Sequence, residues 1–137
     1  MTDDISERFP GEGVAPTLRT FAAPKDVNIN GDIFGGWVLS QMDVAGGVVA
    51  ARRAAGPVAT VGIEAMTFHR PVLIGDEVSL YATVVRVGRT SIRVKIDTWA
   101  RRGFGAETVK VTEGLFTYVA IGPDRRPRPV DPEGGAT

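Results

Sequence analysis

Residues 33–51 form an apolar run, IFGGWVLSQMDVAGGVVAA, that leaves few choices of fold. Its strongly polar side chains are Ser40, Gln41 and Asp43. A helix that is apolar nearly all round belongs in the middle of a protein, covered by other elements. The run approaches the length of a membrane span, but Asp43 would cost roughly 2.5–3.5 kcal/mol near a bilayer centre. We therefore expect a buried helix in a soluble, cytoplasmic protein that has no membrane partner.

Glycines mark both ends of this helix. It opens at the Gly35-Gly36 pair and should stop at Ala55-Gly56-Pro57, where a glycine is followed by a proline. Inside the helix, Gly46 and Gly47 each cost about 1 kcal/mol relative to alanine. Their presence makes sense if another part of the structure approaches the helix backbone there.

The composition excludes several classes of protein. A chain of 137 residues favours a single domain. Sixteen Lys and Arg residues balance sixteen Asp and Glu residues, so no net charge draws the protein towards nucleic acid. Because there is no cysteine, disulfides, thiolate metal sites and cysteine nucleophiles are excluded, and a reducing compartment fits. The acidic start, MTDDISERF, is unlike a signal peptide.

After the helix, the sequence changes to the alternation that is typical of strands. Four segments after the helix show it: residues 59–68, 77–87, 91–100 and 109–121. A weaker strand pattern, residues 17–22, precedes the helix. Strands joined by short turns predict an antiparallel sheet, and one helix packed against it gives an α+β fold. The helix is more apolar than one sheet face can cover, so we expect a curved sheet or a partner subunit.

Three zones divide the chain. We expect a flexible lead-in over residues 1–13, one domain over residues 14–122, and a tail over residues 123–137. The tail is rich in proline and glycine, and we expect it to be mobile.

Asp43 is the first candidate for chemistry. An ionised carboxylate inside an apolar helix is costly unless it is paired, hydrogen-bonded or needed for a reaction. A structural interpretation has it meeting solvent or a partner subunit, or capping a neighbouring amide. In the functional interpretation it acts as a general base or a nucleophile. The pattern alone leaves both open.

The loop before the helix, residues 26–34 (DVNINGDIF), adds Asn28 and Asn30. Either asparagine can simply be a turn residue. In the functional interpretation, one amide orients a water or a carbonyl oxygen beside Asp43. The Gly35-Gly36 pair would place bare backbone amides at a helix N-terminus, which suits an oxyanion. The pattern does not choose between the two asparagines.

Two further groups are weaker candidates. The segment Arg86–Ser91 (RVGRTS) is adequate as a strand–strand turn, although two arginines and two hydroxyls also suit a phosphate contact. His69 is the only histidine, so nothing favours a zinc site, and no metal is expected. It has no recognisable Ser or Cys partner for a hydrolytic triad, and we interpret it as structural or as a peripheral ligand contact.

The run from Asn28 to Asp43, NINGDIFGGWVLSQMD, resembles the signature of hotdog-fold acyl-CoA thioesterases, in particular the bacterial YciA-type branch. Three later segments agree: residues 62–72 (GIEAMTFHRPV), 87–92 (VGRTSI) and 115–121 (LFTYVAI). The likeness extends from about Thr17 to Val130. Many relatives have a histidine where this chain has Phe34, a departure that bears on the acyl pocket rather than on the Asp/Asn pair.

The resemblance implies a hotdog fold, in which a long central helix is wrapped by a curved five-stranded antiparallel sheet. It also implies homodimers whose sheets join edge to edge, often assembled as trimers of dimers. The active site would lie at the dimer interface, with the catalytic Asp and Asn supplied by opposite subunits. The substrate would be an acyl-coenzyme A thioester, and no metal or redox cofactor would be needed.

Matched onto this chain, the family's catalytic roles fall on Asp43 as the carboxylate, Asn28 as its amide partner and the Gly36 amide as the oxyanion donor. Contacts to the substrate would come from the loop and helix start, from the strand end at Phe68-His69-Arg70 and from the turn at Arg89-Thr90-Ser91. These residues are Asn30, Gly35, Phe68, His69, Arg70, Gly88, Arg89, Thr90 and Ser91. Two alternatives remain: a non-catalytic acyl-CoA-binding hotdog module, and a hydroxyacyl-thioester dehydratase, which would need a histidine paired with an acid on the helix.

Overall fold

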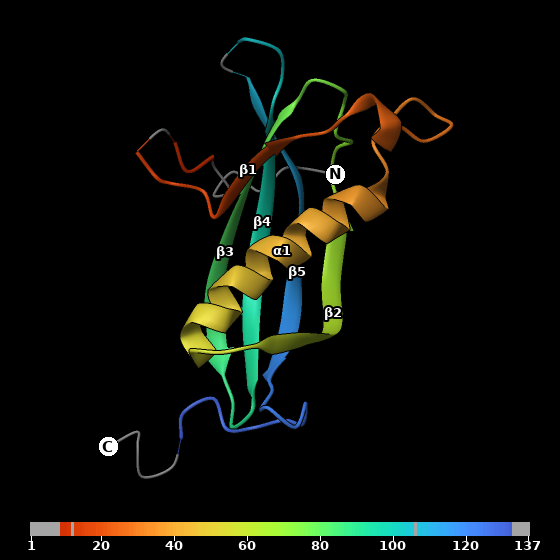
Figure 1. Cartoon of the computed structure of the whole chain (residues 1–137). Helices are drawn as coiled ribbons and strands as arrows, with labels where there is room; N and C mark the ends of the chain where they lie inside the picture. Colours follow the sequence, from red (N-terminus) through yellow and green to blue (C-terminus); the bar gives the residue numbers. More distant parts are fainter. Residues whose placement is uncertain (1–8, 12, 106, 133–137) are drawn as a thin grey trace.

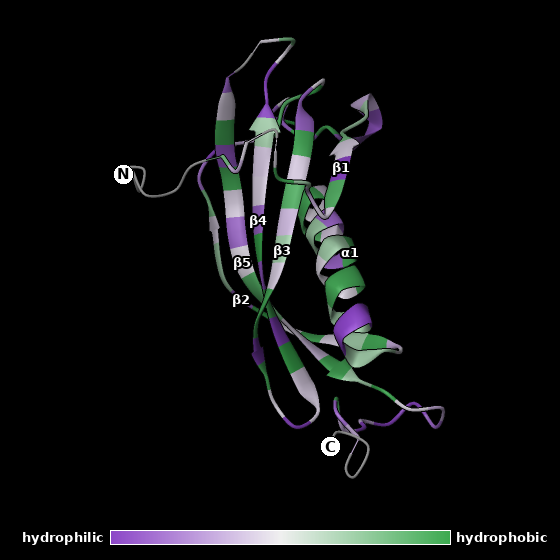
Figure 2. Cartoon of the chain, turned by 90° about the vertical axis from the view of Figure 1, so that its left-hand side faces the viewer, coloured by the Kyte–Doolittle hydropathy of each residue, from purple (hydrophilic) through white to green (hydrophobic). Residues whose placement is uncertain are grey.

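The computed structural model describes residues 9–11, 13–105 and 107–132 (Figure 1). One long helix lies obliquely across one face of a five-stranded antiparallel sheet, which confirms the predicted α+β class and architecture (Figures 1 and 2). The elements, in chain order, are β1 (Leu18–Phe21), the short 3-10 turn η1 (Pro24–Asp26), α1 (Gly35–Ala54), β2 (Val58–Phe68), β3 (Glu77–Val87), β4 (Ser91–Arg101) and β5 (Thr108–Ala120).

The order of strands across the sheet is β1-β3-β4-β5-β2, and every neighbouring pair is antiparallel. The strand that follows the helix, β2, therefore does not pair with the next strand along the chain. It pairs with β5, which separates it from β4, and residues 69–76 carry the chain across to β3. This arrangement leaves β2 as one of the two edges of the sheet.

The helix begins and ends where the glycines indicate. It runs from Gly35 to Ala54, and Ala55 adopts a left-handed backbone with φ of 55°. The Ala55 and Gly56 amides then donate to the carbonyls of Arg52 and Ala51, at 3.2 and 3.1 Å, and so close the last turn. No helix in the described part of the chain is long and apolar enough to cross a bilayer.

The core lies between α1 and the sheet. The helix buries a stripe at helical spacing, formed by Val38, Met42, Ala45, Gly46, Ala50 and Ala54. Facing it, β4 buries Ile92, Val94 and Ile96, as its alternating pattern predicts. The other side of the helix is open, because Val44 is 53% exposed and Val48 is also exposed. Within one chain, the sheet thus covers only part of the apolar helix.

The described parts of both chain ends make packing contacts. Residues 1–8 and 12 of the expected lead-in lie outside the described residues, but Phe9 packs edge-on against Tyr81 and Trp99. The tail over residues 123–132 is not loose. Val130 is buried, and Arg128 donates to the Ala54 carbonyl at 2.7 Å. The described part of the tail, residues 123–132, therefore packs against the last turn of the helix.

Candidate functional site

The Asp43 carboxylate lies half-buried in the middle of α1 and is held through one oxygen. Its Oδ1 accepts a hydrogen bond from the Thr60 hydroxyl on β2 at 2.7 Å, and a second from the Tyr118 hydroxyl on β5 at 3.0 Å. In the part of the chain that the structure describes, no group donates to Oδ2. Among the described residues, the carboxylate is thus held through Oδ1 alone.

The Tyr118 hydroxyl can reach Asp43 because the helix has no side chain at Gly46. A Cβ built at Gly46 would lie 2.3 Å from that hydroxyl, whereas one at Gly47 would have no neighbour closer than 3.9 Å. The expected close approach to the helix backbone is therefore confirmed at Gly46. Burial, followed by the hydrogen bond and the negative charge of Asp43, raises the pKa of Tyr118, so that the phenol stays protonated and donates.

A cavity of about 340 Å³ lies between the start of α1 and the end of β2. Five of the predicted site residues line it together: Asn28, Gly35, Phe68, His69 and Arg70. Ile33 and Val38 add an apolar wall. The structure thus brings together the loop, the helix start and the strand end that the sequence motif singles out. Asp43 is not among the residues that line this cavity.

The two asparagines of the loop have different positions. The Asn28 side-chain oxygen accepts from the backbone amides of Asn30 and Asp32, at 2.8 and 3.1 Å, and so ties the loop together. This leaves the Asn28 amide nitrogen as the donor available to a ligand in the cavity. The Asn30 side chain is exposed and does not line the cavity. Of the two, the geometry places Asn28 where a ligand contact is possible.

The start of α1 presents open backbone amides. Its N-cap residue, Phe34, offers no side-chain hydrogen bond, and the first amides that bond back to the Phe34 carbonyl are those of Trp37 and Val38. The Gly35 and Gly36 amides precede them and point out of the helix end, as the first amides of any helix do. A Cβ at Gly36 would meet nothing within 4 Å in this chain. A bare backbone at Gly36 is therefore not required by packing within one chain.

The turn Gly88–Ser91 lies far from the cavity, at the other end of the sheet (Figure 1). It is a tight β3–β4 hairpin in which the Gly88 amide donates to the Ser91 carbonyl at 2.8 Å. The Arg89 carbonyl accepts from the Val130 amide at 2.8 Å, so the turn is also joined to the tail. A single chain does not bring this turn together with Phe68, His69 and Arg70.

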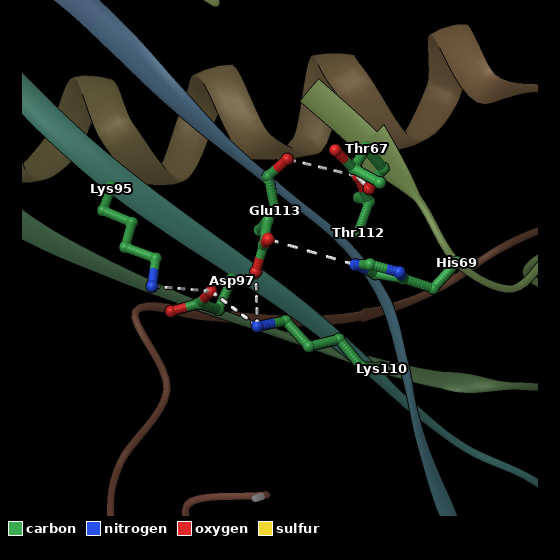
Figure 3. Close-up of polar contacts among 7 residues, drawn as sticks. All are labelled: Thr67, His69, Lys95, Asp97, Lys110, Thr112 and Glu113. Carbon is green, nitrogen blue, oxygen red and sulfur yellow. Dashed lines mark hydrogen bonds and ion pairs between the residues drawn. The ribbon is translucent and has the colours of Figure 1, made fainter. Parts of the chain in front are cut away.

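His69 belongs to the cavity wall and also to a chain of charged groups on the sheet (Figure 3). Its Nε2 lies 4.0 Å from Glu113 Oε2, and Lys110 lies 2.7 Å from Glu113 and 3.1 Å from Asp97. The acidic group that approaches the imidazole thus comes from β5 rather than from the helix. Among the described residues, no three His, Asp or Glu side chains cluster as a metal site would require.

Sequence reasoning missed Thr60 and Tyr118, the two hydroxyls on Asp43. Thr60 is a threonine in a strand, where threonine is common, and it gives no signal of its own. Tyr118 had an indirect signal, because two adjacent glycines inside a helix indicate that another group packs closely there. The sequence does not reveal which residue that is, since Tyr118 is 75 positions away from Asp43.

Comparison with known proteins identifies the family. A family model described as the thioesterase superfamily matches residues 30–103. An uncharacterized acyl-CoA thioester hydrolase of Zymomonas mobilis is 49% identical over 136 residues, which cover 96% of this chain and 91% of that protein. The acyl-CoA thioester hydrolase YciA of Salmonella typhimurium is 49% identical over 120 residues, covering 85% and 90%.

The fold agrees with solved structures. A hexameric thioesterase of Yersinia pestis superimposes with a TM-score of 0.81 at 43% sequence identity, covering 89% of this chain and 97% of that one. The sequence identity with these proteins is 43–49% and extends over most of each chain. The chain therefore belongs to the thioesterase superfamily, within its hotdog-fold acyl-CoA thioester hydrolases of the YciA type.

Proposed function

We propose that this protein hydrolyses acyl-coenzyme A thioesters to the free acid and coenzyme A, with Asp43 as the reacting carboxylate. The observation that carries the proposal is the geometry of Asp43, whose Oδ1 is held by two hydroxyls while Oδ2 receives no hydrogen bond from the described residues. A carboxylate fixed in this way is suited to proton transfer or to nucleophilic attack. The names of the relatives support the same reaction.

Two chemical routes suit this carboxylate. In the first, Asp43 accepts a proton from a water whose oxygen attacks the thioester carbonyl carbon, and the C–S bond then breaks as the sulfur takes up a proton. In the second, Asp43 itself attacks the carbonyl carbon, coenzyme A leaves, and water hydrolyses the resulting anhydride. In both, the carbonyl oxygen gains negative charge, which the amide of Gly36 at the helix N-terminus would stabilise.

The complete site would need a second copy of the chain. Gly36 lies about two helical turns, or roughly 10 Å, before Asp43, and the cavity that Asn28 lines does not include Asp43. We place the partner's helix start and its Asn28 opposite Asp43. Asn28 would then orient the water or the thioester through its free amide nitrogen, in a homodimer with two equivalent sites.

The exposed apolar surface supports this assembly. Val44 and Val48 on α1 are exposed, as are Val61, Ile63 and Phe68 along the edge strand β2. An unpaired edge that carries exposed apolar side chains is suited to pairing with another copy. The Yersinia pestis relative is hexameric, and we propose that this chain likewise forms a homodimer that can assemble as a trimer of dimers.

Coenzyme A would be held by groups from both ends of the sheet. Phe68, His69 and Arg70 line the cavity beside the helix start, and the hairpin Gly88–Ser91 offers an arginine and two hydroxyls suited to phosphate. Because these groups lie at opposite ends of one chain, the hairpin that serves a given cavity would come from another subunit.

The test is release of free thiol from a panel of acyl-CoA esters, from acetyl to palmitoyl. We compare the wild type with Asp43→Ala and, as a matched control, with Asp124→Ala in the exposed tail. We expect the kcat of Asp43→Ala to fall by roughly 10²- to 10⁴-fold, with the oligomer intact by size-exclusion chromatography. Asp124→Ala should match the wild type. An Asp43→Ala variant that keeps full turnover would exclude the assigned role.

The alternatives predict other results in the same assay. An acyl-CoA-binding module would bind the esters tightly and release no thiol. A dehydratase would need an acid of the helix beside its histidine, whereas the acid in contact with His69 is Glu113 on β5. No observation favours either alternative over hydrolysis.

A further inference from the structure

We propose that Tyr118 is a positioning residue for the reaction, and that by holding Oδ1 of Asp43 it makes Oδ2 the reacting oxygen. The proposal rests on the catalytic role proposed above for Asp43. Tyr118 would not touch the substrate. It would act through the carboxylate, and Gly46 would be the residue that permits this contact.

The tyrosine ring is held rigidly. Tyr118 is buried and stacks on Phe116, with ring centroids 6.4 Å apart and planes 19° from parallel. Its hydroxyl lies 3.0 Å from Asp43 Oδ1 and 3.2 Å from the Asp43 backbone carbonyl. The hydroxyl has a single proton, and a bond to an ionised carboxylate is stronger than one to a carbonyl. The shorter contact, to Oδ1, is therefore the one that the proton serves.

The second hydroxyl on the same oxygen decides which oxygen is reactive. Thr60 donates to Oδ1 from β2, while Tyr118 donates from β5, so Oδ1 is held from two strands of the sheet. Two donors withdraw electron density from Oδ1 and disfavour a new proton or a new bond on it. No described residue donates to Oδ2, so its lone pairs remain free to form the new bond.

Tyr118 is suited to donate a hydrogen bond to the carboxylate. Its pKa is raised by burial and by the neighbouring carboxylate, so it remains a neutral donor near neutral pH. It is not suited to act as a base itself. The hydroxyl can hold the carboxylate without competing with it for a proton.

Gly46 is the counterpart of Tyr118 on the helix. A Cβ at this position would lie 2.3 Å from the Tyr118 hydroxyl and 2.7 Å from Ile96 Cδ1, so Gly46→Ala must push the tyrosine away from Asp43. The adjacent Gly47 is a matched control, because its nearest neighbour would be Tyr118 Cε2 at 3.9 Å, an ordinary contact distance. Both changes add the same methyl group to the same helix.

The experiment measures kcat and KM for Tyr118→Phe, Gly46→Ala, Gly47→Ala and the double variant Tyr118→Phe/Gly46→Ala. Loss of alignment at a reacting group can cost up to about 10²-fold. We expect kcat to fall roughly 10- to 100-fold in Tyr118→Phe and in Gly46→Ala, with KM within about twofold of the wild type. Gly47→Ala should keep the wild-type kcat. The double variant should fall no further than the lower single variant, because both remove one contact.

Several outcomes would overturn the proposal. Tyr118→Phe with a wild-type kcat would do so, and so would a rise in KM alone, which would make Tyr118 a substrate contact. Effects that multiply in the double variant would mean that the two residues act separately. If Tyr118→Phe does not fold, as judged by its melting temperature and oligomeric state, the contrast between Gly46→Ala and Gly47→Ala decides the matter.

The proposed function can fail separately from this inference. If Asp43→Ala keeps its activity, the catalytic role of Asp43 falls, and the role of Tyr118 falls with it. If Asp43→Ala is inactive while Tyr118→Phe and Gly46→Ala are both unimpaired, only the positioning role is lost and the hydrolysis proposal stands.

Discussion

The strands β4 and β2 have the same length, eleven residues each, yet they serve different purposes. β4 lies in the middle of the sheet, is paired on both sides and buries every second side chain beneath the helix. β2 is paired only with β5, its register shifts twice, and Val61, Ile63 and Phe68 are exposed along it. β4 builds the core, whereas β2, whose register shifts twice against one partner, carries Thr60 and the cavity residue Phe68.

The two strands differ in how many neighbours their backbones must bond to. A central strand has neighbours on both edges and a helix above it, and the β3–β4 and β4–β5 ladders each shift register only once. An edge strand can bulge, because one side of its backbone is not committed. In β2 the second shift surrounds Ala65, which has a positive φ of 56°. The site is therefore built where the fold tolerates deviation.

The comparison is tested most strongly by truncating an isoleucine at the same place in each strand. Ile96 and Ile63 are both the sixth residue of their strands, but Ile96 is fully buried and Ile63 is 41% exposed. We expect Ile96→Ala to lower the free energy of unfolding by about 2–5 kcal/mol, because it leaves a cavity beneath α1. Ile63→Ala should lower it far less. Urea unfolding of both variants measures the difference, and equal losses would contradict the division of roles.

A smaller effect is expected where β2 bulges against β5. A Cβ at Gly114 would lie 2.3 Å from Met66 Sδ, within the second irregular part of β2. We expect Gly114→Ala to cost about 1–3 kcal/mol through overpacking. Gly62→Ala is its control, because a Cβ there meets nothing within 4 Å. Thermal unfolding tests the pair, and an unaffected Gly114→Ala would mean that Met66 moves aside freely.

The smallest effect on the fold, but a large one on assembly, is expected from Val61→Lys. Val61 is 60% exposed and lies between the paired residues Thr60 and Gly62, so the lysine disturbs no core contact. It should still break pairing between copies along β2, since a charged side chain blocks an edge. We expect a folded but dissociated protein without thiol release, measured by light scattering and circular dichroism.

Val85→Lys is the matched control for that variant. Val85 is likewise exposed and lies at a register shift, but on β3 inside the sheet. It should keep both the oligomer and the activity. If Val61→Lys stays assembled, the edge of β2 is not the contact between copies.

The parts that the sequence predicts well are those governed by local patterns. The ends of α1 follow from the glycines and the proline that flank it, and β4 from strict alternation between Ile92 and Ile96. The edge position of β2 could not be predicted, because strand order depends on pairing between distant segments. The packing of the tail also depends on distant segments, because Arg128 donates to the carbonyl of Ala54 on the helix. The amino-acid composition of the tail does not reveal this contact.

The candidate site shows the same division. The motif from Asn28 to Asp43 is one continuous segment, so it can be read from the sequence. The hydroxyls that hold Asp43 come from two strands, 17 and 75 positions further along. The two asparagines of the loop are separated by the folded loop itself: Asn28 lines the cavity and accepts two backbone hydrogen bonds, whereas Asn30 is exposed.

The strand order also has a consequence for how the protein is made. Val58 pairs with Ala120 and Phe68 with Thr112, so β2 leaves the ribosome long before the strand that will hold it. Until β5 emerges, β2 is exposed on both of its edges, and its pairing must wait for a distant segment. The surface that we assign to the contact between copies therefore becomes complete only after β5 has been made. Two chains that still lack β5 would have no correct edge to share, so assembly should wait for that strand.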